Sequence, residues 1–256
     1  MSLIPSLISS AAGILAARRK CGEQGARLPE WCRPSDVDTA LAIQAAVTEQ
    51  LGDPIGAWKC GLPAESRIVM APIYAGNISI DSPCYVRARA GQVRIEPELA
   101  FIVGHDLPVR DVPYTPAEVD AAIARTHLAL ELIDSRYSHP DDAGFAENLA
   151  DGLLNQGLFI GPQVDDDEAR AISNMTIRVI LELDQEIRLD GHHPNGDPRA
   201  PLYWLVEFLR RRGQGLQADQ AIITGSYVGS FNVPVRQNIA IRYGDLGVLK
   251  VRFAQQ

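Results

Sequence analysis

The sequence predicts an α+β fold in which a helical N-terminal part precedes a large mixed or antiparallel sheet. Apolar residues recur at helical spacing through much of residues 1–55, whereas short apolar runs separated by Gly, Pro, Asn and Asp follow from Ala57 onward. Only two helices are expected among the later strands, and no glycine-rich nucleotide loop follows any strand. We therefore expect a helical part at 1–55 and a β-rich domain at 56–256, not a doubly wound sheet.

The composition is that of an ordinary globular protein. The chain has 256 residues, enough for one large core, and a net charge of −8. Phosphate contacts need clustered Lys and Arg, so we expect neither nucleic acid nor an anionic membrane as a partner. No Cys-x-x-Cys pair occurs, which favours reduced thiols in a cytoplasmic protein. The four cysteines are Cys21, Cys32, Cys60 and Cys84.

Two helices are expected in the N-terminal part. The first covers Met1 to Ala17 and ends near Cys21; its basic residues follow the apolar stretch, an order unlike that of a signal peptide. Ser35 or Asp36 caps the second helix. No apolar run is long enough to span a membrane.

The β-rich part contains eight expected strands and two helices. The strands are 56–60, 84–90, 93–103, 127–134, 156–162, 175–183, 220–224 and 239–253. The helices are 116–125, opened by Thr115 with Pro116 at its first position, and about 200–212. Residues 244–247 indicate a hairpin turn, and the acidic run 165–168 a solvated turn or helix start and not a metal site.

Two glutamates separated by one residue, Glu96 and Glu98, lie in the expected strand 93–103. Alternate side chains of a strand share a face, so these carboxylates should project together. They could form the solvent-exposed face of an amphipathic strand, or part of a metal site. Pro97 between them removes a ladder donor and belongs at an edge or a bulge, and bulges often re-aim side chains near active sites.

A third acid, Glu131, lies inside the apolar run 128–133, so both faces of that strand are expected to be covered. Desolvating an unpaired charge is costly, so Glu131 needs a cation or several donors. Arg136 and Lys59 are candidate partners. Another is Mg²⁺ or Mn²⁺, because three converging carboxylates repel one another and supply hard oxygen ligands. Such a site suits a substrate that chelates through two oxygens, such as a 2-oxo acid.

Several short segments follow one another in a distinctive order from about residue 10 to the C-terminus. They are Trp58-Lys59-Cys60-Gly61, Glu96-x-Glu98, the strand 130–136, Gly157-Leu158-Phe159-Ile160-Gly161, Trp204-Leu205, Thr224-Gly225-Ser226 and 244–253. In this order the chain resembles the 2-keto-4-pentenoate hydratase family. That family includes 4-oxalocrotonate decarboxylases and belongs to the fumarylacetoacetate hydrolase superfamily.

The resemblance implies a mixed β-roll or barrel-like core with a helical N-terminal part, and a homo-oligomer. It implies that Glu96, Glu98 and Glu131 hold Mg²⁺ or Mn²⁺, and it makes Lys59 a candidate acid or base beside the chelated oxygens. A partly desolvated lysine beside a metal has a lowered pKa, as proton transfer requires. From the residues alone, the alternative for Lys59 is a structural salt bridge.

Three more residues are candidates for binding substrate. Thr224 and Ser226 could hold a substrate carboxylate, or could form a helix cap or turn bond. Arg136 is the third candidate. His192 and His193 lie in a turn-rich stretch for which we expect a flexible surface loop, with substrate contact as the less favoured alternative.

The chain also departs from the family pattern at two places. Hydratases usually carry an acid in a segment like Pro-Asp-Tyr/Phe-Gly after the lysine, whereas residues 68–74 contain none. Hydratases also tend to read Ala-Asp-Asn-x-Ser-Ser-Gly before the glycine-bounded strand, whereas residues 150–157 contain no serine. The metal-binding residues are retained, and the groups that would steer protons and water differ.

These observations predict a metal-dependent hydratase, a lyase acting on a 2-hydroxydienoate or 2-oxo-alkenoate as in aromatic-compound catabolism. Decarboxylation of a vinylogous 2-oxo acid uses the same electron sink and is the nearest alternative. Hydrolysis of a carbon–carbon bond is less favoured, because no histidine precedes His105. A non-catalytic 2-oxo-acid-binding homologue is the alternative of a different class.

Overall fold

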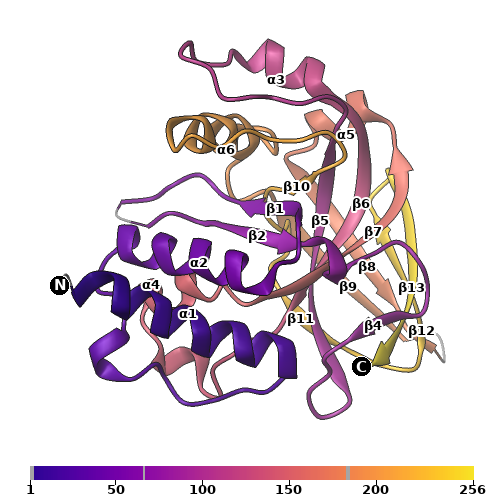
Figure 1. Ribbon diagram of the computed structural model, residues 1–256. Coiled ribbons are helices and arrows are strands. Elements are labelled where there is room, and N and C mark those ends of the chain that lie inside the picture. Colours follow the sequence, from indigo (N-terminus) through magenta and orange to yellow (C-terminus); the bar gives the residue numbers. More distant parts are fainter. Residues whose placement is uncertain (1–2, 66, 183–184) are drawn as a thin grey trace.

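Residues 3–65, 67–182 and 185–256 are described by a computed structural model of the chain (Figure 1). Residues 1 and 2 of the expected first helix, and residue 183 of the expected strand 175–183, lie outside this range. The architecture is the expected one: helices at the N-terminus and a large curled sheet of mixed direction. Among the residues described, no helix is long and apolar enough to cross a membrane.

The N-terminal part consists of α1 (Leu3–Cys21), a short 3-10 turn (Glu30–Cys32) and α2 (Val37–Leu51). Asp36 is the N-cap of α2, and its carboxylate accepts from the backbone N–H of Thr39 at 2.8 Å. In Figure 1, α1 and α2 lie beside α4 (Phe145–Ala150) on one side of the sheet. The apolar faces of α1 and α2 join the same hydrophobic core as the strands.

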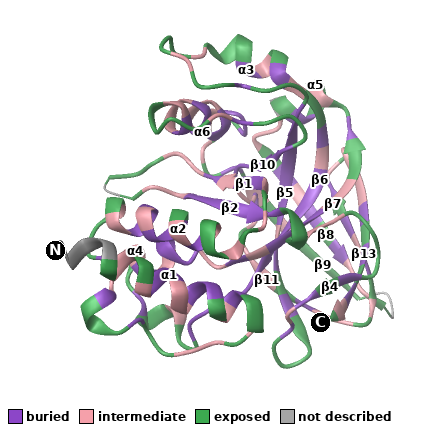
Figure 2. Cartoon of the chain, viewed as in Figure 1, coloured by how far each residue is buried: buried purple, intermediate pink, exposed green. Residues whose placement is uncertain are grey.

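The larger sheet has eight strands, with parallel and antiparallel pairs. Its order is β2 (Met70–Tyr74), β1 (Ile55–Cys60), β10 (Ala221–Ile223), β5 (Gln92–Val103), β6 (Ile123–Ile133), β7 (Asn155–Val164) and β3 (Ile78–Ser79), with β11 (Phe231–Pro234) also paired to β5. The pairs β1–β10 and β3–β7 are parallel. Figure 2 shows that β5 and β6 are buried along most of their length, as expected for strands covered on both faces.

A second sheet of five strands covers one face of the first. Its order is β4 (Cys84–Val86), β13 (Gly247–Gln255), β12 (Asn238–Tyr243), β8 (Asn174–Ile180) and β9 (Glu186–His192). The predicted hairpin turn lies between β12 and β13. The buried Tyr243 hydroxyl donates to the carbonyl of Ala129 at 2.6 Å, which ties this sheet to β6.

Three further helices complete the fold: α3 (Pro116–Ala122), α5 (Asp166–Ala171) and α6 (Ala200–Arg211). The predicted helix 116–125 is three residues too long, because β6 begins at Ile123. The acidic run 165–168 starts α5, with Asp165 as its N-cap, as predicted. Strand β2 was not predicted; it contains Pro72, which an edge strand tolerates because one side of its ladder is unpaired.

Strand β5 has an opening in its pairing on one side. There β11 pairs with residues 92–95 and β10 with residues 100–102, so residues 96–99 have no strand neighbour on that side within the described ranges. Pro97 falls inside this opening, where its missing N–H costs no ladder bond, which confirms the predicted edge position. The loop between β10 and β11 crosses here: Ser226 Oγ donates to the Pro97 carbonyl at 2.8 Å.

Candidate metal centre

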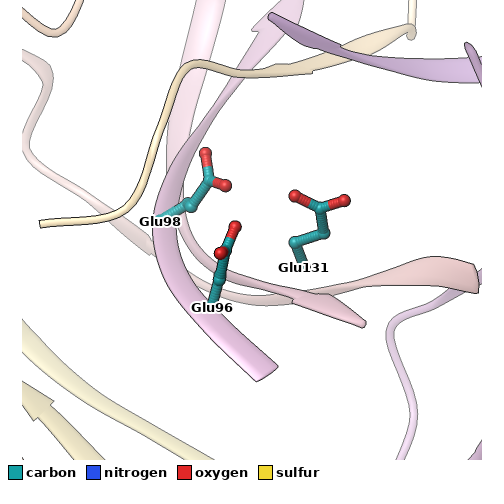
Figure 3. A group of neighbouring side chains, drawn as sticks. All are labelled: Glu96, Glu98 and Glu131. Carbon is teal, nitrogen blue, oxygen red and sulfur yellow. The ribbon is translucent and has the colours of Figure 1, made fainter. Parts of the chain in front are cut away.

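Glu96, Glu98 and Glu131 converge at the opening in β5 (Figure 3). Glu96 and Glu131 are direct partners across the antiparallel β5–β6 ladder, and Glu98 follows two residues later on the same face. One carboxylate oxygen from each of the three lies within 4.8 Å of the other two. Among the residues described, no other group of three potential metal ligands converges in this way.

Burial separates the two interpretations of this strand. Glu98 is 2% exposed and Glu131 is fully buried, while Glu96 is half-buried. The alternative that these carboxylates lie on a solvent-exposed face of the strand is therefore wrong for Glu98. Three acids gathered away from water need positive charge nearby.

Lys59 supplies part of that charge. Its ammonium lies 2.7 Å from Glu131 Oε1 and also donates to the Leu153 carbonyl at 3.2 Å. Asn155 Nδ2 donates to the same Oε1 at 2.9 Å. The other oxygen, Glu131 Oε2, is buried and has no hydrogen-bond partner among the residues described. A buried carboxylate oxygen without a donor is the position at which a cation would be expected.

Glu98 is held by the loop that crosses the opening. Its Oε2 accepts from the backbone N–H of Gly225 at 2.6 Å. Gly225 has φ +126°, a conformation that favours glycine, and a Cβ there would lie 2.9 Å from the Pro194 side chain. The Thr224-Gly225-Ser226 segment therefore brings a backbone donor to the acid.

Burial and neighbouring charges shift the pKa values of Glu96, Glu98 and Lys59. Burial, followed by the charge of Glu131, raises the pKa of Glu96 from 4.5 to about 7, and the same two causes raise the pKa of Glu98 well above its usual range. For Lys59, burial lowers the pKa, but Glu131 and Glu96 outweigh it, so the pKa is raised. The expected lowering of the Lys59 pKa is thus wrong for the protein groups by themselves.

The raised Glu96 pKa predicts a pH-dependent stability of the ion-free protein. An acid whose pKa is about 7 when folded and 4.5 when unfolded favours folding fully below pH 4.5, and this contribution is lost as pH rises through about 7. In chelator, the free energy of unfolding should fall by about 2 kcal/mol between about pH 5 and pH 8, beyond the change in Glu96→Gln. Urea titrations of both proteins measure this difference, and identical pH slopes would contradict it.

The three glutamates face a cavity of about 230 Å³. It is lined by Lys59, Cys60, Gly61, Leu62, Val69, Glu96, Glu98, Glu131, Pro194, Asn195, Ile223, Thr224 and Gly225. The predicted residues Lys59 and Thr224 are therefore brought together with the metal-site acids. The cavity joins this charged corner to apolar walls, as in small-molecule sites.

The expectation of a flexible surface loop at His192 and His193 is wrong. β9 extends to His192, and His193 is 1% exposed, packed edge-on against the Tyr227 ring with centroids 5.3 Å apart. Its Nε2 lies 3.5 Å from Thr224 Oγ1. Burial lowers the pKa of His193 to about 4, so the imidazole that lies against Thr224 is neutral near pH 7.

The structure does not bring Arg136 or Ser226 to the cavity lining. Arg136 is 1% exposed and its guanidinium is bound to Asp151, with Nε 2.8 Å from Oδ1. It is therefore not the partner of Glu131; Lys59 is. Ser226 Oγ is engaged with backbone carbonyls, of Pro97 at 2.8 Å and Gly229 at 3.2 Å. Both side chains therefore form structural contacts outside the cavity.

The buried Arg136–Asp151 pair predicts a large stability effect. Arg136→Met leaves the Asp151 carboxylate buried with weaker compensation, so the free energy of unfolding should fall by about 3 kcal/mol. Urea unfolding of this variant, with Arg188→Met on an exposed strand as control, measures the loss. A loss below that of the control would show that the pair contributes little.

Two polar residues of the site escaped prediction. Asn155 begins β7 and reaches Glu131, and Asn195 lines the cavity, where its Oδ1 accepts from the Leu62 N–H at 3.3 Å. Asn155 lies in the stretch where the chain departs from the hydratase pattern, and that departure was the available indication. Asn195 sits in a turn-rich stretch whose composition suggests only a loop.

Comparison with known proteins places these residues in a family context. The family described as fumarylacetoacetate (FAA) hydrolase C-terminal matches residues 60–254. A 2-keto-4-pentenoate hydratase of Burkholderia vietnamiensis is 24% identical over 261 residues, which cover 97% of this chain and 98% of that protein. A 2-oxo-hept-4-ene-1,7-dioate hydratase of Escherichia coli is 30% identical over 172 residues, 62% of this chain and 61% of that protein.

The fold of the chain is also similar to that of a solved structure. A solved structure of 4-oxalocrotonate decarboxylase from Pseudomonas putida G7, complexed with magnesium and adipate, has a TM-score of 0.77 at 18% identity and covers 99% of both chains. The family match spans most of this chain and includes all three glutamates. The chain therefore belongs to the fumarylacetoacetate hydrolase family.

Proposed function

We propose that this protein is a divalent-metal-dependent hydratase, a lyase that acts on a 2-hydroxydienoate or a related 2-oxo-alkenoate. One observation carries the proposal: three carboxylates converge on a cavity, and one buried oxygen, Glu131 Oε2, has no donor in the part of the chain that the structure describes. The name of one relative that is matched over nearly its full length, a 2-keto-4-pentenoate hydratase, supports the reaction class.

The residues present fit a hard divalent cation. Glu96, Glu98 and Glu131 offer oxygen ligands only, which suits Mg²⁺ or Mn²⁺ better than a thiophilic metal. Burial, followed by the charge of Glu131, raises the pKa values of Glu96 and Glu98, and a divalent ion would stabilise their charged forms. When bound, the ion would supply a Lewis acid for a substrate carboxylate and the adjacent C2 oxygen.

Lys59 is the proposed acid and base. Glu131 and Glu96 raise its pKa; neutralising them would leave burial as the main influence, and burial lowers the pKa toward the range useful for proton transfer. Lys59 would take the proton from the C2 hydroxyl of the dienol and deliver it to the far end of the conjugated system. Water would then add to the remaining double bond, with its proton returning through Lys59 to C3.

Thr224 and Asn195 are the proposed polar contacts to substrate. Both line the cavity, and Thr224 is backed by the neutral His193. Gly61 and Ile223 also line the cavity and contribute to its apolar walls, which suit the hydrocarbon part of a dienoate.

The test is a spectroscopic assay with 2-hydroxypenta-2,4-dienoate. The ultraviolet absorbance of the dienoate should disappear when enzyme and Mg²⁺ are both present, and a 4-hydroxy-2-oxo acid should accumulate. Product formation that is unchanged by a chelator would refute the metal-dependent reaction.

Decarboxylation of a vinylogous 2-oxo acid is the second candidate, and the cavity lining favours it in one respect. Among the residues described, Lys59 is the only amine that lines the cavity, and no imidazole lines it. One proton delivered to carbon is sufficient for decarboxylation, whereas hydration must also deprotonate water. Release of CO₂ from 4-oxalocrotonate, without formation of a hydroxy acid from the dienoate, would favour this candidate.

A further inference from the structure

We infer that the cleft next to the metal centre, lined by Arg87 and Arg94, binds a second carboxylate of the substrate, so that the natural substrate is a dicarboxylate. This inference rests on the proposed function, because it concerns the far end of the molecule whose 2-oxo-acid head the glutamates would hold. We call this space the arginine cleft; it measures about 340 Å³.

The β5–β6 ladder places the arginine cleft beside the glutamates. Arg94 precedes Glu96 by two residues, and Ile133 follows Glu131 by two residues; Arg94 and Ile133 are direct partners, as are Glu96 and Glu131. Alternate residues share a face, so the four side chains form two successive rungs of one face, separated by about 6.7 Å. Both Arg94 and Ile133 line the arginine cleft.

One short turn contacts both the glutamate cavity and the arginine cleft. Gly152, Leu153 and Leu154 all have positive φ, at 83°, 51° and 66°. The Leu153 carbonyl accepts from Lys59 Nζ at 3.2 Å, and Leu154 lines the arginine cleft. Two successive non-glycine residues in this conformation are costly, and such strain clusters at ligand sites. Leu154 and Ile133 give the arginine cleft an apolar surface, against which the carbon chain of a dicarboxylate would pack.

The arginine cleft has an excess of positive charge in a chain whose net charge is −8. Arg89 is bound to Asp134, with Nη2 2.7 Å from Oδ2, so these two charges offset each other. Arg87 and Arg94 remain, and neither lies within 4 Å of a carboxylate among the residues described. Arg87 is anchored by donating to the Arg19 carbonyl.

Arg94 is the residue best placed to bind the distal group. Its Nε donates to Ser230 Oγ at 2.7 Å, which fixes the side chain at one nitrogen. The two terminal nitrogens form no hydrogen bond with the residues described, and they offer the paired donors that a carboxylate binds. Gln92 and Asn232 line the same space and can complete the hydrogen bonding.

The test compares two unreactive ligands that share the chelating head. We expect 2-oxohexanedioate to bind about tenfold more tightly than 2-oxohexanoate in the presence of Mg²⁺, as measured by calorimetry. Arg94→Met should abolish this preference and leave the affinity for 2-oxohexanoate unchanged. Arg94→Lys should restore part of it. Arg242→Met, an exposed arginine on the other sheet, is the matched control and should retain the full preference.

The outcomes separate this inference from the proposed function. Equal affinities in the wild-type protein, or a preference that survives in Arg94→Met, would overturn the distal carboxylate site while leaving the metal centre intact. Binding of 2-oxohexanoate that does not depend on Mg²⁺ would instead overturn the proposed function. Loss of binding of both ligands in Arg94→Met, with unfolding unchanged, would also contradict the assignment, because Arg94 would then act on the head group.

Discussion

Glu131→Gln is expected to lower turnover of a 2-hydroxydienoate by about three orders of magnitude. The substitution keeps the size of the side chain but removes the buried negative charge of Glu131, whose Oε2 has no donor among the described residues. The remaining carboxylates, of Glu96 and Glu98, should bind the ion too weakly to compete with its hydration by water. Steady-state kinetics over a range of Mg²⁺ concentrations measures the loss.

The matched control for Glu131→Gln is Glu186→Gln, which removes an exposed carboxylate on β9. It should leave both turnover and the Mg²⁺ dependence unchanged. Full activity in Glu131→Gln would show that the buried acid is only a structural partner of Lys59.

Lys59→Met should lower turnover by about 10²- to 10⁴-fold while metal binding persists, because Lys59 moves the proton and does not hold the ion. The same substitution leaves Glu131 buried without its ammonium partner, so the ion-free protein should lose about 3 kcal/mol of stability. Saturating Mg²⁺ should restore most of that stability. Kinetics, together with urea unfolding with and without the ion, measures both effects.

Lys250→Met, an exposed lysine on β13, is the control for Lys59→Met. The control should match the wild-type protein in all three measurements. Metal affinity that falls together with turnover in Lys59→Met would contradict the assignment of separate roles, because Lys59 and the ion would then be parts of one binding unit.

The fold class followed from local patterns, and the missing parts have physical reasons. Alternation and apolar runs predicted β5 and β6 because these strands are long and covered on both faces. β2 was hidden by Pro72, which is tolerated only because β2 lies at the edge of the sheet, a property that a local pattern does not contain. β11 is short, and its pairing with one end of β5 depends on the loop that crosses the opening.

Local sequence patterns also predicted part of the candidate site. Glu96 and Glu98 share a face through strand periodicity, and the acid inside an apolar run indicated burial of Glu131. The register that makes Glu96 and Glu131 direct partners is a long-range property. The partners of Arg136 and His193 also depend on distant segments: Asp151 binds the arginine, and Tyr227 and Thr224 cover the imidazole. Local sequence therefore did not reveal the partners of either residue.

Titration with Mn²⁺, followed by the electron paramagnetic resonance of the free ion, tests most directly whether the three glutamates form a metal centre. The wild-type protein is expected to bind one Mn²⁺ per chain, and Glu131→Gln to bind none at the same concentrations. Absence of binding by the wild-type protein, or undiminished binding by Glu131→Gln, would contradict a metal centre formed by Glu96, Glu98 and Glu131.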